Sequence, residues 1–139
     1  MRVANLLIGS VVFALSGCAA PRAADEAKLE LTRLAPDPAR TPEAVIQVYG
    51  ARAVGVKGTF GVHTWVAVKP SGDSAYTVYE VIGWRQRYGA SPVVVHQRMP
   101  DARWFGAQPE LISDRRGPGT DELIAKVDRA ARDYPWANE

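Results

Sequence analysis

The sequence contains a single cysteine, Cys18, among 139 residues. One cysteine cannot form an intrachain disulfide, and residues 19–139 offer no thiol nucleophile. Cysteine-based zinc and iron–sulfur sites are excluded for the same reason. Two histidines with scattered carboxylates make a weak case for any other metal, so we expect neither a metal nor a cofactor.

Clusters of charge and glycine-rich phosphate loops are also lacking. The net charge is +2 and the basic residues are spread along the chain, which argues against a nucleic-acid partner. Gly55, Gly58 and Gly61 lack the GxGxxG spacing and the following helix of a phosphate-binding loop, so they indicate an ordinary flexible loop.

The N-terminus carries the longest apolar run, Val3–Leu15, directly after Arg2. The run is shorter than the ~20 apolar residues of a transmembrane helix and is typical of a secretory signal peptide. Leu15-Ser16-Gly17-Cys18 resembles a bacterial lipobox, in which the cysteine thiol receives the lipid. An ordinary signal peptide with a chance cysteine is the alternative.

We therefore expect a lipoprotein signal peptide over residues 1–17 and a membrane anchor through lipidated Cys18. Ala19, rather than Asp, follows the cysteine. By resemblance to Gram-negative lipoprotein sorting, this favours the outer membrane, facing the periplasm. Residues 18–40 are rich in Ala, Pro and charged residues and predict a flexible tether, while residues 41–139 predict a single domain.

The domain is organised around two predicted strands, Val62–Val68 and Tyr76–Ile82, joined by a turn over Pro70–Ser74. Both runs are rich in β-branched and aromatic residues and are apolar on both faces, which predicts a hairpin in the middle of a sheet.

Centring the turn on Gly72 places Trp65 opposite Tyr79, and His63 opposite Val81. A slip of one residue would instead bring His63 opposite Glu80.

Further strands are predicted at Ala44–Tyr49 and Pro92–Arg98, and Trp104-Phe105 is interpreted as a plug over the core. A helix is predicted from Thr120, as N-cap, to Pro135. The expected fold is α+β: a small antiparallel sheet of about four strands with a C-terminal helix packed across it.

His63 is the candidate catalytic or binding residue, because it enters a central strand directly after a flexible loop. Glu80 is a candidate orienting carboxylate for its imidazole. The alternatives are a structural role for His63 and pairing of Glu80 with Arg85 or Lys69, and His96 is interpreted as a surface residue.

No nucleophile can be assigned from the sequence. Ser71 and Ser74 lie in the turn, at the opposite end of the strand from His63, and nothing marks Thr59 or Thr64 as activated.

Several segments resemble the bacterial domain of unknown function 3750 family. They are Val45–Tyr49, Gly61–Lys69, Tyr76–Arg85, Trp104–Gly106, Pro109–Ile112 and Ala130–Pro135. The resemblance covers about residues 42 to 137 and carries no established activity.

The layout of His63, strand, turn and strand is more distantly similar to permuted NlpC/P60 papain-like proteins. That similarity implies a partial permuted papain-like core with His63 as base. Family members continue into an Asn/Ser-rich segment that opens a further helix, so we expect this chain, which ends at Glu139, to lack the element that would supply a nucleophile.

Two classes of function are left open by these residues. The favoured one is a lipid-anchored envelope protein with a non-catalytic binding or structural role. The alternative is a hydrolase of amide or ester bonds of the permuted papain-like type, with His63 as general base.

Overall fold

The structure is a computed structural model that describes residues 31–134. The predicted signal peptide, Cys18 and the first part of the predicted tether lie outside the described residues. Within them, three short 3-10 helices, five strands and one α-helix follow in order. These are η1 (Pro38–Arg40), β1 (Val45–Arg52), η2 (Gly55–Thr59), β2 (Val62–Lys69), β3 (Thr77–Val81), η3 (Gly83–Tyr88), β4 (Val93–Gln97), β5 (Glu110–Arg116) and α2 (Thr120–Arg132).

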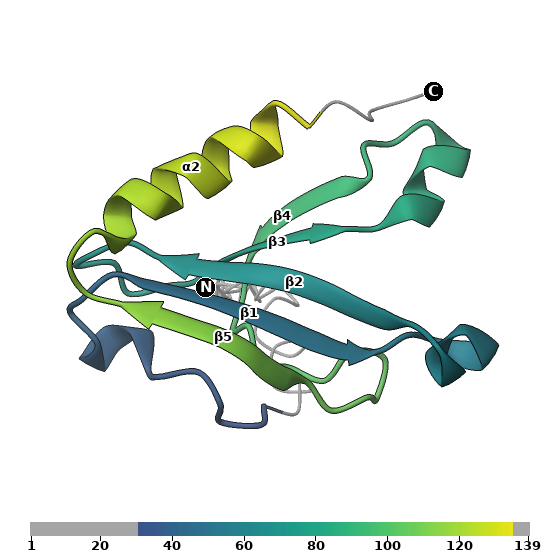
Figure 1. The fold of residues 1–139 in the computed structure, drawn as a ribbon, viewed down its shortest axis with the longest axis horizontal. Helices are drawn as coiled ribbons and strands as arrows, with labels where there is room; N and C mark the ends of the chain where they lie inside the picture. Colours follow the sequence, from purple (N-terminus) through teal and green to yellow (C-terminus); the bar gives the residue numbers. More distant parts are fainter. Residues whose placement is uncertain (1–30, 135–139) are drawn as a thin grey trace, which may run out of the picture.

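The five strands form one antiparallel sheet in the order β4-β3-β2-β1-β5, with α2 lying across one face (Figure 1). The predicted hairpin is therefore central, and the α+β prediction is confirmed with five strands rather than about four. The additional strand, β5, was not predicted because its sequence, ELISDRR, holds only two apolar residues. Such a charged strand is typical of a sheet edge.

The predicted register of the central hairpin is wrong by one residue. Trp65 pairs with Glu80 and Val66 pairs with Tyr79. Trp65 and Glu80 therefore share a face of the sheet with His63, because alternate residues of a strand point the same way. The slip runs in the opposite direction from the one that the sequence left open, which would have placed His63 directly opposite Glu80. Either slip puts Glu80 on the same face as His63, and this shared face creates the candidate site.

Each face of the sheet has its own apolar cluster. On the helix side, Ala44, Val68 and Ile124 are buried with partly buried neighbours on β1, β2 and β3. The opposite face carries the larger cluster. It consists of Val45, Tyr49, Ala51, Trp65, Ala67, Tyr76 and Val78, with Ala35, Met99, Trp104, Ala107 and Leu111 packed against it. The site lies on this second face.

The helix begins one residue from the predicted cap. Gly119, with φ +78°, is the N-cap of α2, and Thr120 is the first helical residue, so the prediction that Thr120 caps the helix is wrong. A glycine suits this position because its backbone is left-handed there. Asp121 and Glu122 lie in the first turn, where carboxylates favour the helix dipole. The hydroxyl of Tyr79 donates to Asp128 at 3.0 Å and ties the helix to β3.

The segment after β4 crosses back over the large cluster. Trp65 Nε1 donates to the carbonyl of Pro100 at 2.8 Å, and Thr32 Oγ1 donates to the carbonyl of Asp101 at 3.0 Å. The part of the predicted tether that the structure describes, residues 31–40, thus contacts the segment that covers the site. Among the described residues, no helix is both long and apolar enough to cross a bilayer.

Candidate functional site

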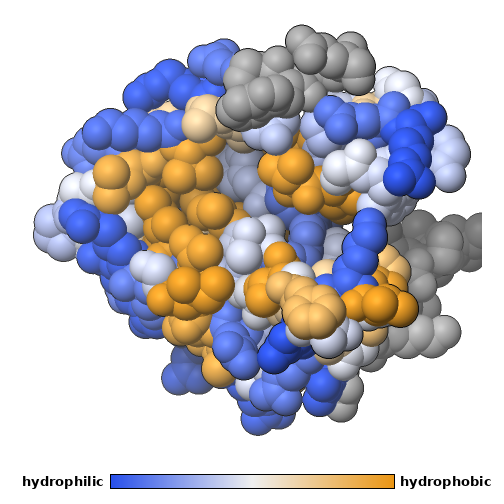
Figure 2. Space-filling view, turned by 45° about the vertical axis from the view of Figure 1, so that its right-hand side comes forward, coloured by the Kyte–Doolittle hydropathy of each residue, from blue (hydrophilic) through white to orange (hydrophobic). Residues whose placement is uncertain are grey.

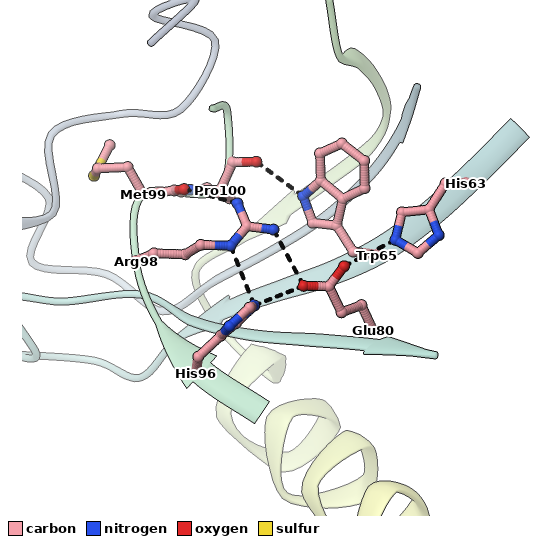
Figure 3. Close-up of polar contacts among 7 residues, drawn as sticks. All are labelled: His63, Trp65, Glu80, His96, Arg98, Met99 and Pro100. Carbon is pink, nitrogen blue, oxygen red and sulfur yellow. Dashed lines mark hydrogen bonds and ion pairs between the residues drawn. The ribbon is translucent and has the colours of Figure 1, made fainter. Parts of the chain in front are cut away.

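A carboxylate buried between two imidazoles lies at the centre of the site (Figure 3). The Glu80 side chain is 1% exposed. Its Oε2 lies 2.8 Å from His63 Nε2, and its Oε1 lies 2.7 Å from His96 Nε2. Arg98 Nη2 lies 3.5 Å from the same Oε1. These partners come from β2, from β4 and from the residue just beyond β4, so the central carboxylate joins three neighbouring strands of the sheet.

The pairing of the strands explains this convergence. On β3, Glu80 lies opposite Trp65 of β2. On β4, His96 lies opposite Val78, two residues from Glu80. His63, Glu80, His96 and Arg98 consequently all project from one face, because residues two apart on a strand share a face.

Glu80 is held in its ionised form. Burial by itself raises the pKa of this carboxyl, but the hydrogen bond from His63 and the charges of Arg98, His96 and His63 outweigh it. The pKa of Glu80 therefore lies below its ordinary value. An ionised carboxylate only accepts hydrogen bonds, so Nε2–H of His63 must be the donor.

The same reasoning fixes the proton of His96. Arg98 Nε lies 3.2 Å from His96 Nε2, while Glu80 lies 2.7 Å from that nitrogen. One ring nitrogen cannot donate to Glu80 and accept from Arg98 at once, and the shorter contact with the carboxylate places a proton on Nε2. Arg98 is held instead by the carbonyl of Met99, at 3.2 Å, and by the face of Trp65, at 5.7 Å from the ring centroid.

The ring of His63 is fixed by stacking as well as by its hydrogen bond. The indole of Trp104 lies parallel to it, with centroids 3.8 Å apart and planes 12° apart. Trp65 stacks at 5.8 Å. Trp104 thus fulfils the predicted plug role, whereas the neighbouring Phe105 is 72% exposed and covers little of the core.

The second ring nitrogen of His63, Nδ1, points away from Glu80 (Figure 3). No hydrogen bond to Nδ1 occurs among residues 31–134. The ring borders a cavity of about 460 Å³. Its other walls are Ala53, Val54, Lys57, Val81, Ile82, Gly83, Trp84, Trp104 and Phe105. The His63 cavity is therefore mainly apolar, with the imidazole and one ammonium as its ionisable groups among the described residues.

The structure brings the two predicted site residues, His63 and Glu80, into contact. The alternative pairing of Glu80 with Arg85 or Lys69 is wrong. Glu80 pairs with His63 rather than with Arg85 or Lys69, since Arg85 donates to the carbonyl of Ser91 and Lys69 to the carbonyls of Pro70 and Asp73.

The interpretation of His96 as only a surface residue is wrong, because its ring contacts Glu80 directly at 2.7 Å. Arg98 and Trp104 were also missed as parts of the site. The spacing of His96 and Arg98, two residues apart on one predicted strand, was the available signal.

The walls of the His63 cavity include no serine, threonine, tyrosine or cysteine among the described residues. The described walls of this cavity thus supply no hydroxyl or thiol group for attack on a bound substrate. Nor do the described residues include a group of three or more His, Cys, Asp or Glu side chains arranged to hold a metal ion.

In a comparison with protein families, the family described as "Protein of unknown function (DUF3750)" matches residues 43–139. Searches of curated proteins and of solved structures found no match. The more distant similarity to permuted NlpC/P60 proteins stays a prediction.

Proposed function

Because this chain belongs to the DUF3750 family, whose function is unknown, we propose a function from the site alone: binding of a small acidic amphiphile in the His63 cavity. The observation that carries this proposal is the free Nδ1 of His63 at the wall of an apolar cavity. Glu80 accepts from Nε2–H of His63, so in the uncharged form of the ring the lone pair is on Nδ1, the nitrogen that Glu80 does not contact.

The chemistry of the cavity defines the ligand class. Trp84, Trp104 and Phe105 offer flat apolar surfaces for a ring or a short aliphatic chain. A carboxylic acid on the ligand can give its proton to Nδ1 of His63. The carboxylate that results accepts a hydrogen bond from the imidazolium and is attracted by the ammonium of Lys57. A carboxylic acid with an apolar body satisfies all of these groups at once.

Binding of 2-naphthoate, measured by calorimetry, tests this proposal. A hydrogen bond to a charged group contributes about 1.5–3 kcal/mol, so His63→Ala is expected to weaken binding about 10- to 150-fold. The control Ile112→Ala removes a side chain that lies outside the cavity and is 59% exposed, and it should leave binding unchanged. 2-Methylnaphthalene, which lacks the acid, should bind more weakly than 2-naphthoate, and its affinity should be the same for the unchanged chain and for His63→Ala.

Chemical shifts of the His63 ring nitrogens provide a direct readout. Naphthoate should shift Nδ1 of His63 and leave the ring signals of His96 almost unchanged. Equal naphthoate affinity in the chain and in His63→Ala, or binding without a shift at Nδ1, would rule out this ligand site.

Hydrolysis is the second candidate, and the close His63–Glu80 pair favours it. A carboxylate that accepts a hydrogen bond from an imidazole at 2.8 Å is how a general base is oriented in hydrolases. The nucleophile would have to be water or a group outside the described residues. If p-nitrophenyl butyrate is hydrolysed by the chain and not by His63→Ala, the purely binding function is wrong and this alternative replaces it.

We also propose that the domain acts at a membrane of the cell envelope, anchored through lipidated Cys18. The support is the lipobox-like sequence Leu15–Cys18 after an apolar run of signal-peptide length. Cys18→Ala should abolish the incorporation of labelled palmitate into the protein in a metabolic labelling experiment. Equal labelling of both proteins would contradict the anchor.

A further inference from the structure

Three loops meet around the mouth of the His63 cavity. They are residues 52–61 with η2, residues 81–92 with η3, and residues 102–109, and each contributes to the cavity wall, through Lys57, Trp84 and Phe105 respectively. Figure 1 shows η2 and η3 projecting beyond the strands at the same end of the sheet, opposite the N-terminal end of α2. We refer to these segments as the three loops.

The tips of the three loops carry large apolar and aromatic side chains that the domain leaves in solvent. Phe60 is 93% exposed, Val56 86%, Tyr88 80%, Phe105 72% and Trp84 57%. Figure 2 turns this end of the molecule forward and shows hydrophobic surface broken up by hydrophilic side chains. Exposed aromatic residues gathered on one surface mark a contact with another molecule or with a membrane.

The charges on the same loops have one sign. The three loops contain Arg52, Lys57, Arg85, Arg87 and Arg103, and none of them contains Asp or Glu. Of the carboxylates that directly flank these segments, Glu80 and Asp101 are buried, whereas Glu110 is exposed at the start of β5, beside Gly50 of β1. Lys57 and Arg87 are exposed, and neither makes an ion pair with another described residue.

We propose that the three loops dock on the surface of an anionic lipid bilayer. Aromatic side chains such as Trp84 and Tyr88 suit the headgroup region, where one end of the ring is apolar and the other is wet. Cations beside them lie at the level of the lipid phosphates and attract them. The three loops contain no carboxylate that would repel these phosphates. Val56 and Phe60, at the most exposed tip, enter the acyl boundary.

This docking orients the domain as well as binding it. The mouth of the His63 cavity lies among the three loops, so it faces the lipid when they are docked. The proposal rests on the loop tips and their charge and does not require that His63 binds a ligand. It also differs from the anchor at Cys18, which would hold the protein near a membrane without fixing which surface faces it.

Depth-dependent quenching of Trp84 tests the docking in the full chain. The protein is added to vesicles of brominated phosphatidylcholine, with or without an equal amount of phosphatidylglycerol, and the same is done with Trp84→Phe. The difference between the two proteins isolates the emission of Trp84. We expect strong quenching with phosphatidylglycerol, much weaker quenching without it, and loss of quenching in 0.5 M salt, where charges are screened.

A charge variant and a matched control locate the contact. Each cation near an anionic surface strengthens binding about fivefold, so Lys57→Gln with Arg87→Gln should weaken docking about 25-fold. Lys126→Gln with Arg129→Gln removes two exposed cations from α2, which is not part of the three loops, and should leave docking unchanged. Phe60→Ser should also reduce quenching without changing the charge.

Cosedimentation of the same samples with vesicles reports the N-terminal anchor separately. A loop variant that still sediments but is no longer quenched supports docking by the three loops, whether or not naphthoate binds. Absence of Trp84 quenching with phosphatidylglycerol, or equal losses in the loop and α2 charge variants, would overturn the proposal. Concentration-dependent dimers that Phe60→Ser abolishes, in the absence of quenching, would assign the surface to a second copy of the chain instead.

Discussion

Replacing Glu80 by Gln removes the charge that three side chains share while keeping the size of the buried group. The carboxylate oxygens lie 2.8 Å from His63 Nε2 and 2.7 Å from His96 Nε2, and glutamine keeps only one acceptor oxygen. One close hydrogen bond is therefore lost, at about 1.5–3 kcal/mol, and Arg98 loses its counter-charge. Since Glu80 is 1% exposed, solvent compensates little.

We expect Glu80→Gln to lower the free energy of unfolding by about 3 kcal/mol at pH 7, within the range for breaking a buried ion pair. For a domain of about 100 residues, this corresponds to a fall in Tm of about 12–24 °C. A loss of this size is a large share of the 5–15 kcal/mol total that is typical of natural domains.

The pH dependence of this effect has a definite sign. The pKa of Glu80 in the folded domain lies below its ordinary value of about 4.5. The charged Glu80 therefore stabilises the fold fully above that value and loses this contribution as pH falls through the lower, folded pKa. Gln cannot titrate, so the stability difference between the chain and Glu80→Gln should shrink towards pH 3.

Urea unfolding followed by tryptophan fluorescence at pH 7, 5 and 3 measures both effects. Glu110→Gln is the matched control, because Glu110 is exposed on the edge strand β5, and its effect should stay within about 0.5 kcal/mol at each pH. A difference for Glu80→Gln below 1 kcal/mol at pH 7, or one of unchanged size at pH 3, would refute the shared-charge account of the site.

Three further substitutions test how the site is supported. Trp65→Phe leaves the carbonyl of Pro100 without its donor, so unfolding free energy should fall by about 1–3 kcal/mol in urea titrations. Gly58→Ala brings a Cβ within 2.2 Å of the carbonyl oxygen of Ala53, so η2 must shift, and amide hydrogen exchange in residues 53–61 should speed up with little change elsewhere. Tyr79→Phe removes the hydrogen bond from β3 to α2 and should cost about 1 kcal/mol, measured by thermal unfolding.

The arrangement of the central hairpin could be predicted from its composition, but its register could not. Both faces of each strand are apolar, so the pattern alone does not say which face of β3 joins which face of β2. The structure pairs Val68 with Thr77, which puts the midpoint of the turn between Gly72 and Asp73 rather than on Gly72. That half-residue difference moves Glu80 from the opposite face of the sheet to the face that carries His63.

The rest of the site depends on contacts that no local pattern contains. His96 and Arg98 reach Glu80 because β4 pairs with β3 after the excursion through η3, and Trp104 reaches His63 because the segment after β4 folds back over the sheet. The sequence identified the imidazole and the carboxylate as candidates. Only the order β4-β3-β2 of the strands adds the second imidazole and the guanidinium to the same carboxylate.

The extra partners of Glu80 bear on the choice between binding and catalysis. In a catalytic triad the carboxylate serves one imidazole and stabilises the positive charge that forms on it when the base takes a proton. Here Arg98 and the N–H of His96 already interact with the charge of Glu80, so Glu80 stabilises a positive charge on His63 less strongly. The shared carboxylate still fixes the ring and the proton on Nε2. A ring held in this way is better suited to hold an acidic ligand at Nδ1, whose own carboxylate matches the charge of the ring, than to carry a proton between bond-breaking steps.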